Sequence, residues 1–187
     1  MQKKTSMNRG AIRILKPNVT QDEALRAFSA AGFSALYWRL RSGPLRRIAD
    51  VYVQYFLFHV KCGNAVRRYF AMDAVDGSLD LFEFPRIPQG PEVLTLEGRN
   101  RIRAALGEAC AAELLREKVL RVIFQQGFFK LRDARVEIIP ADCELYLPYW
   151  LGFYERRGAV RCRAMDAVRR RIEGAKASAF FEHWLAA

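Results

Sequence analysis

The chain contains one phrase twice, and this repetition constrains its fold more than any other feature. Residues 52–57 read Tyr-Val-Gln-Tyr-Phe-Leu, and residues 71–75 read Ala-Met-Asp-Ala-Val. Residues 146–151 read Tyr-Leu-Pro-Tyr-Trp-Leu, and residues 164–168 repeat Ala-Met-Asp-Ala-Val. The first blocks lie 94 positions apart and the second blocks 93. Self-similarity at a nearly constant offset predicts one supersecondary unit that is used twice.

The repetition extends to the helices that are expected before each phrase. Leu25-Arg26 followed by Gly32-Phe33 matches Leu120-Arg121 followed by Gly127-Phe128, at an offset of 95. Each unit should therefore be a helix packed on a meander of antiparallel strands. Two such tandem units, followed by a short C-terminal helix, predict a protein of the α+β class.

These patterns divide the chain into four parts. We expect a basic lead-in with a possible short strand at 1–19, a first helix-plus-meander repeat at 20–88, a linker rich in proline and glycine at 89–98, and a second repeat with the C-terminal helix at 99–187. The first helix should begin at a capping box formed by Thr20 and Glu23. The central strands are apolar at consecutive positions, which predicts a sheet covered on both faces. Whether the two meanders merge into one sheet or stack face to face is left open.

The turn after each repeated phrase resembles the turn of PepSY domains, which are small α+β domains. The matching residues are Asp73, Ala74 and Gly77 in the first copy, and Asp166 and Ala167 in the second. Asp76 stands where that family usually has threonine, and Arg169-Arg170 replaces its Thr-Gly pair. The resemblance implies a cystatin-like fold and a binding or inhibitory role, commonly outside the cytoplasm and tied to peptidases. The doubled phrase also resembles an uncharacterised family of bacterial proteins, and that resemblance implies no activity.

The sequence predicts no enzymatic activity, no metal site and no cofactor. Asp73 and Asp166 occupy matching frames, so one interpretation is a pair of carboxyls that share a proton. The interpretation we favour is that each side chain caps its own turn by accepting backbone amides. The two histidines, His59 and His183, have no ligands or nucleophile at a functional spacing. The cysteines, Cys62, Cys110, Cys143 and Cys162, also lack a metal-binding spacing.

The sequence predicts neither a secretory signal nor a membrane span. Lys3 and Lys4 are not followed by the apolar run of a signal peptide. No stretch reaches the roughly 18 apolar residues of a transmembrane helix. The expected compartment is therefore the cytoplasm.

Positive charge gathers in the second repeat of a chain whose net charge is +11. Arg161 and Arg163 should share one face of a strand, and Arg169, Arg170 and Arg171 follow it in the turn. Guanidinium groups bind phosphate and carboxylate through paired N–H donors, so these five residues are the candidate anion-binding residues. The alternative interpretation is a solvated strand face that binds nothing.

Aromatic residues mark a second candidate surface. Tyr146, Tyr149 and Trp150 lie close together on one expected strand, where aromatic side chains line either the core or a groove. The function we expect is a non-catalytic binding or interaction module with a protein partner. The alternative is a polyanion-binding protein, whose ligand would be nucleic acid or an acidic surface. An oligomer is compatible with both.

Overall fold

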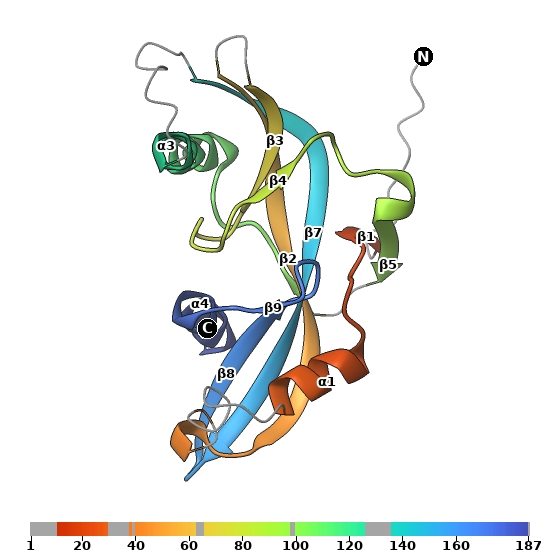
Figure 1. Ribbon diagram of the computed structural model, residues 1–187, viewed down its shortest axis with the longest axis vertical. Coiled ribbons are helices and arrows are strands. Elements are labelled where there is room, and N and C mark those ends of the chain that lie inside the picture. The colour runs from red at the N-terminus through yellow and green to blue at the C-terminus, as the bar shows by residue number, and fades with distance from the viewer. Residues whose placement is uncertain are drawn as a thin grey trace.

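The computed structural model describes residues 11–29, 38, 40–62, 66–97, 100–125 and 136–186, which form a mixed α+β fold (Figure 1). The strands are β1 (Ala11–Leu15), β2 (Leu45–Cys62), β3 (Val66–Asp73), β4 (Phe82–Phe84), β5 (Val93–Glu97), β6 (Arg101–Ile102), β7 (Val136–Arg156), β8 (Ala159–Asp166) and β9 (Arg171–Ile172). The helices are α1 (Gln21–Ser29), α3 (Glu108–Gln125) and α4 (Ala175–Ala186), with the short 3-10 helix η1 (Gly90–Glu92). Among these described residues, no helix has both the length and the apolar character needed to span a membrane. The α+β prediction is confirmed.

Two long antiparallel strands, β2 and β7, form the spine of the sheet (Figure 1). Val53 pairs with Leu147, and these are matching positions of the repeated phrase. Each long strand also forms a hairpin with the strand that follows it. Tyr55 pairs with Asp73 between β2 and β3, and the matching Tyr149 pairs with Asp166 between β7 and β8. The two copies of the phrase therefore have equivalent pairing partners.

The strands merge into one sheet, which answers the question that the sequence left open. The order is β4-β3-β2-β7-β1-β5, with β6 pairing with β2, β8 with β7, and β9 with β8. In β7, the stretch from 145 to 154 is almost entirely buried. The prediction that both faces are covered is confirmed for this strand.

Helices α1 and α3 each pack on the hairpin that lies in the other half of the chain. Phe28 of α1 contributes to a buried cluster with Met165 of β8, and its ring lies over Gly152 of β7. Leu115 of α3 contributes to a second cluster with Met72 of β3. The capping box of α1 is confirmed, because the Glu23 carboxylate accepts from the Thr20 amide at 2.8 Å and the Thr20 hydroxyl accepts from the Glu23 amide at 3.3 Å.

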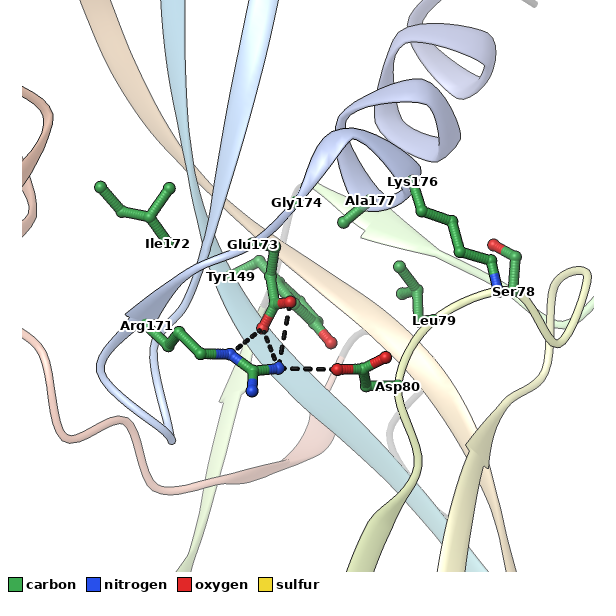
Figure 2. A pocket seen from close by; sticks show the side chains of 10 residues that line it. All are labelled: Ser78, Leu79, Asp80, Tyr149, Arg171, Ile172, Glu173, Gly174, Lys176 and Ala177. Atoms are coloured by element: carbon green, nitrogen blue, oxygen red, sulfur yellow. Dashed lines mark hydrogen bonds and ion pairs between the residues drawn. The ribbon is translucent and has the colours of Figure 1, made fainter. Parts of the chain in front are cut away.

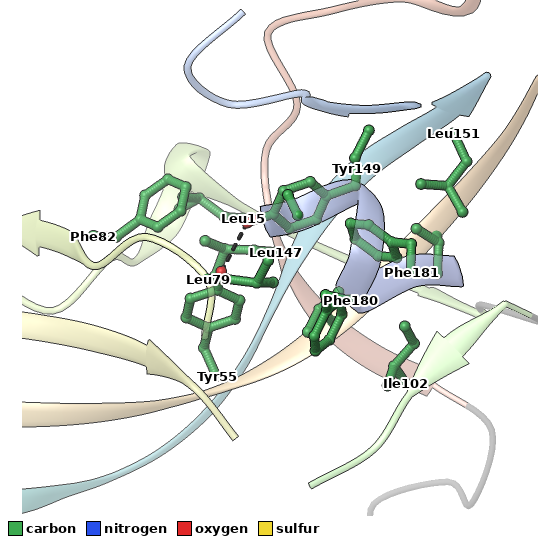
Figure 3. Packing of buried hydrophobic residues seen from close by; sticks show 14 of the residues in the cluster. Leu15, Tyr55, Leu79, Phe82, Ile102, Leu147, Tyr149, Leu151, Phe180 and Phe181 are labelled. Atoms are coloured by element: carbon green, nitrogen blue, oxygen red, sulfur yellow. Dashed lines mark hydrogen bonds between the residues drawn. The ribbon is translucent and has the colours of Figure 1, made fainter. Parts of the chain in front are cut away.

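The largest cluster joins the spine to α4 (Figure 3). Phe180 and Phe181 are both buried, and the Phe181 ring lies 5.3 Å from that of Tyr149. Leu147 and Leu151 of β7 complete this contact. Burial of these side chains fixes α4 against β7 and β8. Residues of α4 form one wall of the cavity that is described below as the candidate site.

Two segments differ from the expected pattern. The expected linker contains η1 and β5, and β5 pairs with β1 from Ala11↔Glu97 to Leu15↔Val93. Pro148 lies inside the long strand without a register shift beside it. The Pro148 carbonyl accepts from the Ala167 amide, so the backbone of Pro148 faces away from β2. On that side, pairing with β1 is recorded at Tyr146 and pairing with β8 begins at Tyr149. Proline is tolerated at this position because no ladder needs the missing amide.

Candidate functional site

The Asp73 carboxylate caps the first turn completely. Its Oδ1 accepts from the amides of Val75, Asp76 and Gly77 at 3.2, 3.1 and 2.9 Å. Its Oδ2 accepts from the Leu79 amide at 2.9 Å, and the residue is fully buried. Burial raises the pKa of this carboxyl, while the amides of Asp76 and Leu79 oppose the shift. The capping role predicted for Asp73 is confirmed.

Asp166 caps the second turn with only one of its oxygens. Oδ1 accepts from the amides of Val168 and Arg169, each at 2.8 Å. Oδ2 is buried without a hydrogen bond, and the nearest cation is the Arg169 Nε at 3.8 Å. Burial raises the pKa of this carboxyl too, because a charged form is poorly solvated there.

This raised pKa predicts a pH-dependent difference between the wild type and Asp166→Asn. The carboxyl contributes stability below the unfolded-state pKa of about 3.9, and this contribution is lost as the pH rises through the higher folded-state pKa. We therefore expect the free energy of unfolding of Asp166→Asn to rise relative to that of the wild type between about pH 4 and pH 7. Urea unfolding of both proteins across this range measures the difference. A difference that stays constant with pH would contradict the prediction.

Two tyrosines lie between the capped turns. The hydroxyls of Tyr55 and Tyr149 are 2.7 Å apart (Figure 3), and burial raises the pKa of both. No hydrogen bond among the described residues joins Asp73 to Asp166. The carboxyls therefore have turn-capping geometry instead of the shared-proton geometry of a catalytic dyad.

A cavity of about 400 Å³ opens beside Tyr149 (Figure 2). Its charged residues neutralise one another, because the Arg171 guanidinium pairs with Asp80 at 2.7 Å and with Glu173 at 3.0 Å. Lys176 lies at the opposite side, next to Ser78 (Figure 2). The balance of charge in this cavity favours no particular ligand.

The turn arginines are spread among internal partners. Arg169 donates to the Leu81 carbonyl and lies 3.7 Å from the centre of the Phe82 ring. Arg170 pairs with Glu23 at 2.8 Å, which joins the second turn to the cap of α1. Together with Arg171, these residues connect parts of the fold. The structure keeps only Arg161 and Arg163 together, on neighbouring positions of one strand face.

The three candidate aromatics lie in three different clusters. Tyr146 donates to Glu144 and Gln54 at 3.2 and 3.3 Å and packs beside β1. Trp150 donates to the Val19 carbonyl at 3.1 Å and packs against α1. Tyr149 packs with α4 and lines a cavity of about 400 Å³. They therefore do not line a common groove.

A second cavity, which we call the arginine cleft, has a volume of about 390 Å³. It lies between the edge of β8, the residues Trp38, Arg41 and Ser42, and α4. Its lining residues are Trp38, Arg41, Ser42, Arg161, Arg163, Glu173, Gly174, Ala175, Ser178, Ala179 and Glu182. Strand alternation places Arg161 and Arg163 on one face of β8, while Cys162 between them packs under α4.

Arg163 is the most deeply buried of the arginines that line the arginine cleft. Its residue exposure is only 8%, and its guanidinium lies 5.2 Å from the centre of the Trp38 ring. Within the described part of the chain, no ion pair neutralises it. Arg161 is more open, with a side-chain exposure of 57%, and lies 3.5 Å from Glu182. The cleft therefore offers a buried cation with an aromatic face beside it.

Other groups in the arginine cleft also suit an acid. Ser42 and Ser178 are buried residues that line it. The N-terminus of α4 faces it through Gly174 and Ala175, and the first turn of this helix contains no acidic residue. Helix N-termini carry a positive partial charge, which adds to the field of the arginines.

The described residues show no metal-binding group. No group of three or more histidine, cysteine or carboxylate side chains among them is placed to hold a metal ion. The His59 ring stacks on Tyr69 with 4.8 Å between ring centres. Burial raises the pKa of the Cys162 thiol to about 12, which keeps it protonated at neutral pH. The side chain of Cys62 lies outside the described residues.

Sequence reasoning missed Trp38, Ser42 and Glu182 as members of the site. Gly43-Pro44 marks the end of a helical segment, but no local signal says that this segment faces β8. Comparison of the chain with models of protein families, with curated proteins and with solved structures finds no match. A functional assignment therefore depends on the geometry of the arginine cleft.

Proposed function

We propose that this protein is a non-catalytic binding module that holds an acidic group of a partner protein in the arginine cleft. The observation that carries the proposal is the placement of Arg163, a buried guanidinium that lines the cleft and forms no ion pair among the described residues. A buried charge costs free energy unless an opposite charge reaches it. A carboxylate in the cleft would supply that charge and accept paired N–H donors.

The proposal includes a duplicated scaffold of two PepSY-like units. The equivalent pairings Tyr55↔Asp73 and Tyr149↔Asp166 support a common origin of the two hairpins. Both turns are capped by an aspartate in the same frame, which supports it further. In this scheme the first unit retains a fully capped turn, and the second unit provides the arginines that bind.

A discrete carboxylate suits the arginine cleft better than a polyanion does. Glu173 and Glu182 line the same cavity and would repel a continuous row of phosphates. The arginines of the turn are paired with internal acceptors, so they do not extend the cleft into a basic track. The net charge of +11 keeps polyanion binding as the second candidate function.

Replacing Arg163 by methionine is expected to weaken binding of an Ala-Ala-Glu-Ala-Ala peptide with blocked termini, which carries a single carboxylate, at least about tenfold, because a charge-assisted bidentate contact is lost. Isothermal titration of the full chain at physiological salt measures this change. Arg116→Met is the matched control, since Arg116 is exposed on α3, away from the cleft, and the change removes the same charge. Arg161→Met is a second variant whose exposed side chain leaves folding intact.

Equal affinities for the Arg163→Met and Arg116→Met proteins would overturn the proposal. Stronger binding of single-stranded DNA than of the peptide, weakened equally by both variants and by salt, would instead favour the polyanion alternative. Selective loss in both Arg163→Met and Arg161→Met supports the cleft as the site.

A further inference from the structure

The outer edge of β8 has backbone groups with little strand pairing. β8 pairs with β7 along its whole length, but β9 covers only Met165 and Asp166. Alternate residues of an antiparallel strand direct both backbone groups to the same side. Val160, Cys162 and Ala164 direct theirs away from β7, because the Cys162 amide donates to Glu182 and the Ala164 carbonyl accepts from Glu173.

Glu182 of α4 occupies this edge in the manner of an incoming strand. One carboxylate oxygen accepts from the Cys162 amide at 3.0 Å, where a neighbouring strand would place its carbonyl. The other oxygen lies 3.5 Å from the Arg161 guanidinium. The Glu182 carboxylate thus makes two contacts that a bound peptide could make: a hydrogen bond to the backbone of β8 and an ion pair with Arg161.

The surfaces beside the edge differ in character. Arg161 and Arg163 line the arginine cleft. Val160 and Cys162 line another cavity, of about 400 Å³, with the exposed Leu185 of α4, and the charged residues Arg47, Arg161 and Glu182 border it too. Val160 and Leu185 are 61% and 46% exposed, so two large apolar side chains face solvent beside the exposed start of β8 at residues 159–161. A strand added here would direct alternate side chains toward arginines and toward apolar groups.

We propose that the acidic ligand is an extended peptide that adds a strand to the outer edge of β8, with acidic residues opposite Arg161 and Arg163 and an apolar residue between them. The peptide displaces the Glu182 carboxylate, which competes with it for the Cys162 amide and for Arg161. This inference rests on the proposed function, because the arginine cleft receives the acidic side chains. Main-chain hydrogen bonds to Val160 and Cys162 supply affinity, and the alternation supplies specificity.

The test uses a fluorescein-labelled Glu-Val-Glu-Val-Glu peptide and fluorescence anisotropy with the full chain. Two further peptides are N-methylated either at both valines or at the second and third glutamates. Methyl groups on the side facing β8 remove ladder donors, and those on the other side do not. We expect one methylated peptide to bind roughly tenfold more weakly than the parent and the other to bind like the parent. Equal affinities of the two methylated peptides would overturn strand addition.

Removal of the competitor provides an independent measurement. Glu182→Ala is expected to bind the parent peptide roughly tenfold more tightly than the wild type does, because the carboxylate no longer occupies the edge. Glu117→Ala is the control, since Glu117 is exposed on α3 and the change in net charge is identical. Affinities that are equal in these two variants would overturn the role of Glu182. If binding of the single-glutamate peptide still depends on Arg163 in that case, the proposed function stands and only the strand-addition inference fails.

Discussion

Asp73→Asn is expected to lower the free energy of unfolding by about 3 kcal/mol, whereas Asp166→Asn is expected to change it by less than about 1 kcal/mol at pH 7. The reason lies in the second carboxylate oxygen. In Asp73 both oxygens accept backbone amides, so an asparagine would place its NH₂ group against an N–H donor. In Asp166 the Oδ2 has no hydrogen bond, and asparagine keeps the acceptor that caps the turn.

Urea unfolding monitored by circular dichroism compares the two variants with the wild type. Each variant loses the same buried negative charge at a matching position of the repeated phrase, so the comparison isolates the amide contacts. Equal losses of stability in the two variants would contradict this account of the turns. A large loss in Asp166→Asn alone would show that its contact with Arg169 outweighs the cost of the buried charge.

The sequence predicted those parts of the fold that depend on local chemistry. The capping box of Thr20 and Glu23 correctly predicted the start of α1. The hairpin after β7 turns at Arg157 and Gly158, whose φ angles of 51° and 79° are those of a two-residue turn with a glycine at its second position, a pattern that the sequence itself displays. The expected short C-terminal helix corresponds to α4, which spans Ala175–Ala186. In the capping box and in the turn, the residues that predict the structure are also the residues that form it.

The sequence did not predict how the segments associate. Nothing local in α1 indicates that Phe28 packs over Gly152, because that contact depends on the pairing of β2 with β7. Residues 93–97 looked like linker, and they form a strand because β1 offers them a ladder. Whether such a segment forms a strand depends on its neighbours, because cross-strand pairing stabilises a strand more than its own propensity does.

Prediction of the site was limited for the same reason. Strand alternation correctly grouped Arg161 with Arg163, and it is a local rule. The turn arginines looked equally available, but their acceptors come from distant segments, such as Glu23 on α1 for Arg170. Trp38 belongs to the cleft through tertiary contacts, since its ring lies 5.2 Å from the Arg163 guanidinium and 5.9 Å from the Tyr154 ring. A run of charged residues in a sequence therefore shows which positions carry a positive charge. Only the fold shows which of these side chains already form ion pairs or hydrogen bonds within the protein.

Gly43 controls the wall of the arginine cleft, and Gly43→Ala is expected to lower the free energy of unfolding by about 3 kcal/mol or more. Gly43 has a φ of +87°, which a residue with a Cβ adopts only at a cost. A Cβ here would lie 2.0 Å from the Glu155 carbonyl oxygen, so the backbone has to move. Because Ser42 precedes this position and lines the cleft, the same displacement should also weaken acidic peptide binding.

Gly158→Ala is the control for this prediction, because it separates backbone conformation from steric overlap. Its φ is +79°, but no atom lies within 4 Å of the added Cβ, so only the conformational cost of about 1 kcal/mol applies. Thermal and urea unfolding measure both variants, and peptide titration reports on the cleft. If Gly43→Ala and Gly158→Ala lower the free energy of unfolding equally, the close approach of Gly43 to Glu155 does not determine the position of Ser42. A greater loss for Gly43→Ala, together with weaker peptide binding, would connect this backbone contact in the first half of the chain to the arginines of the second.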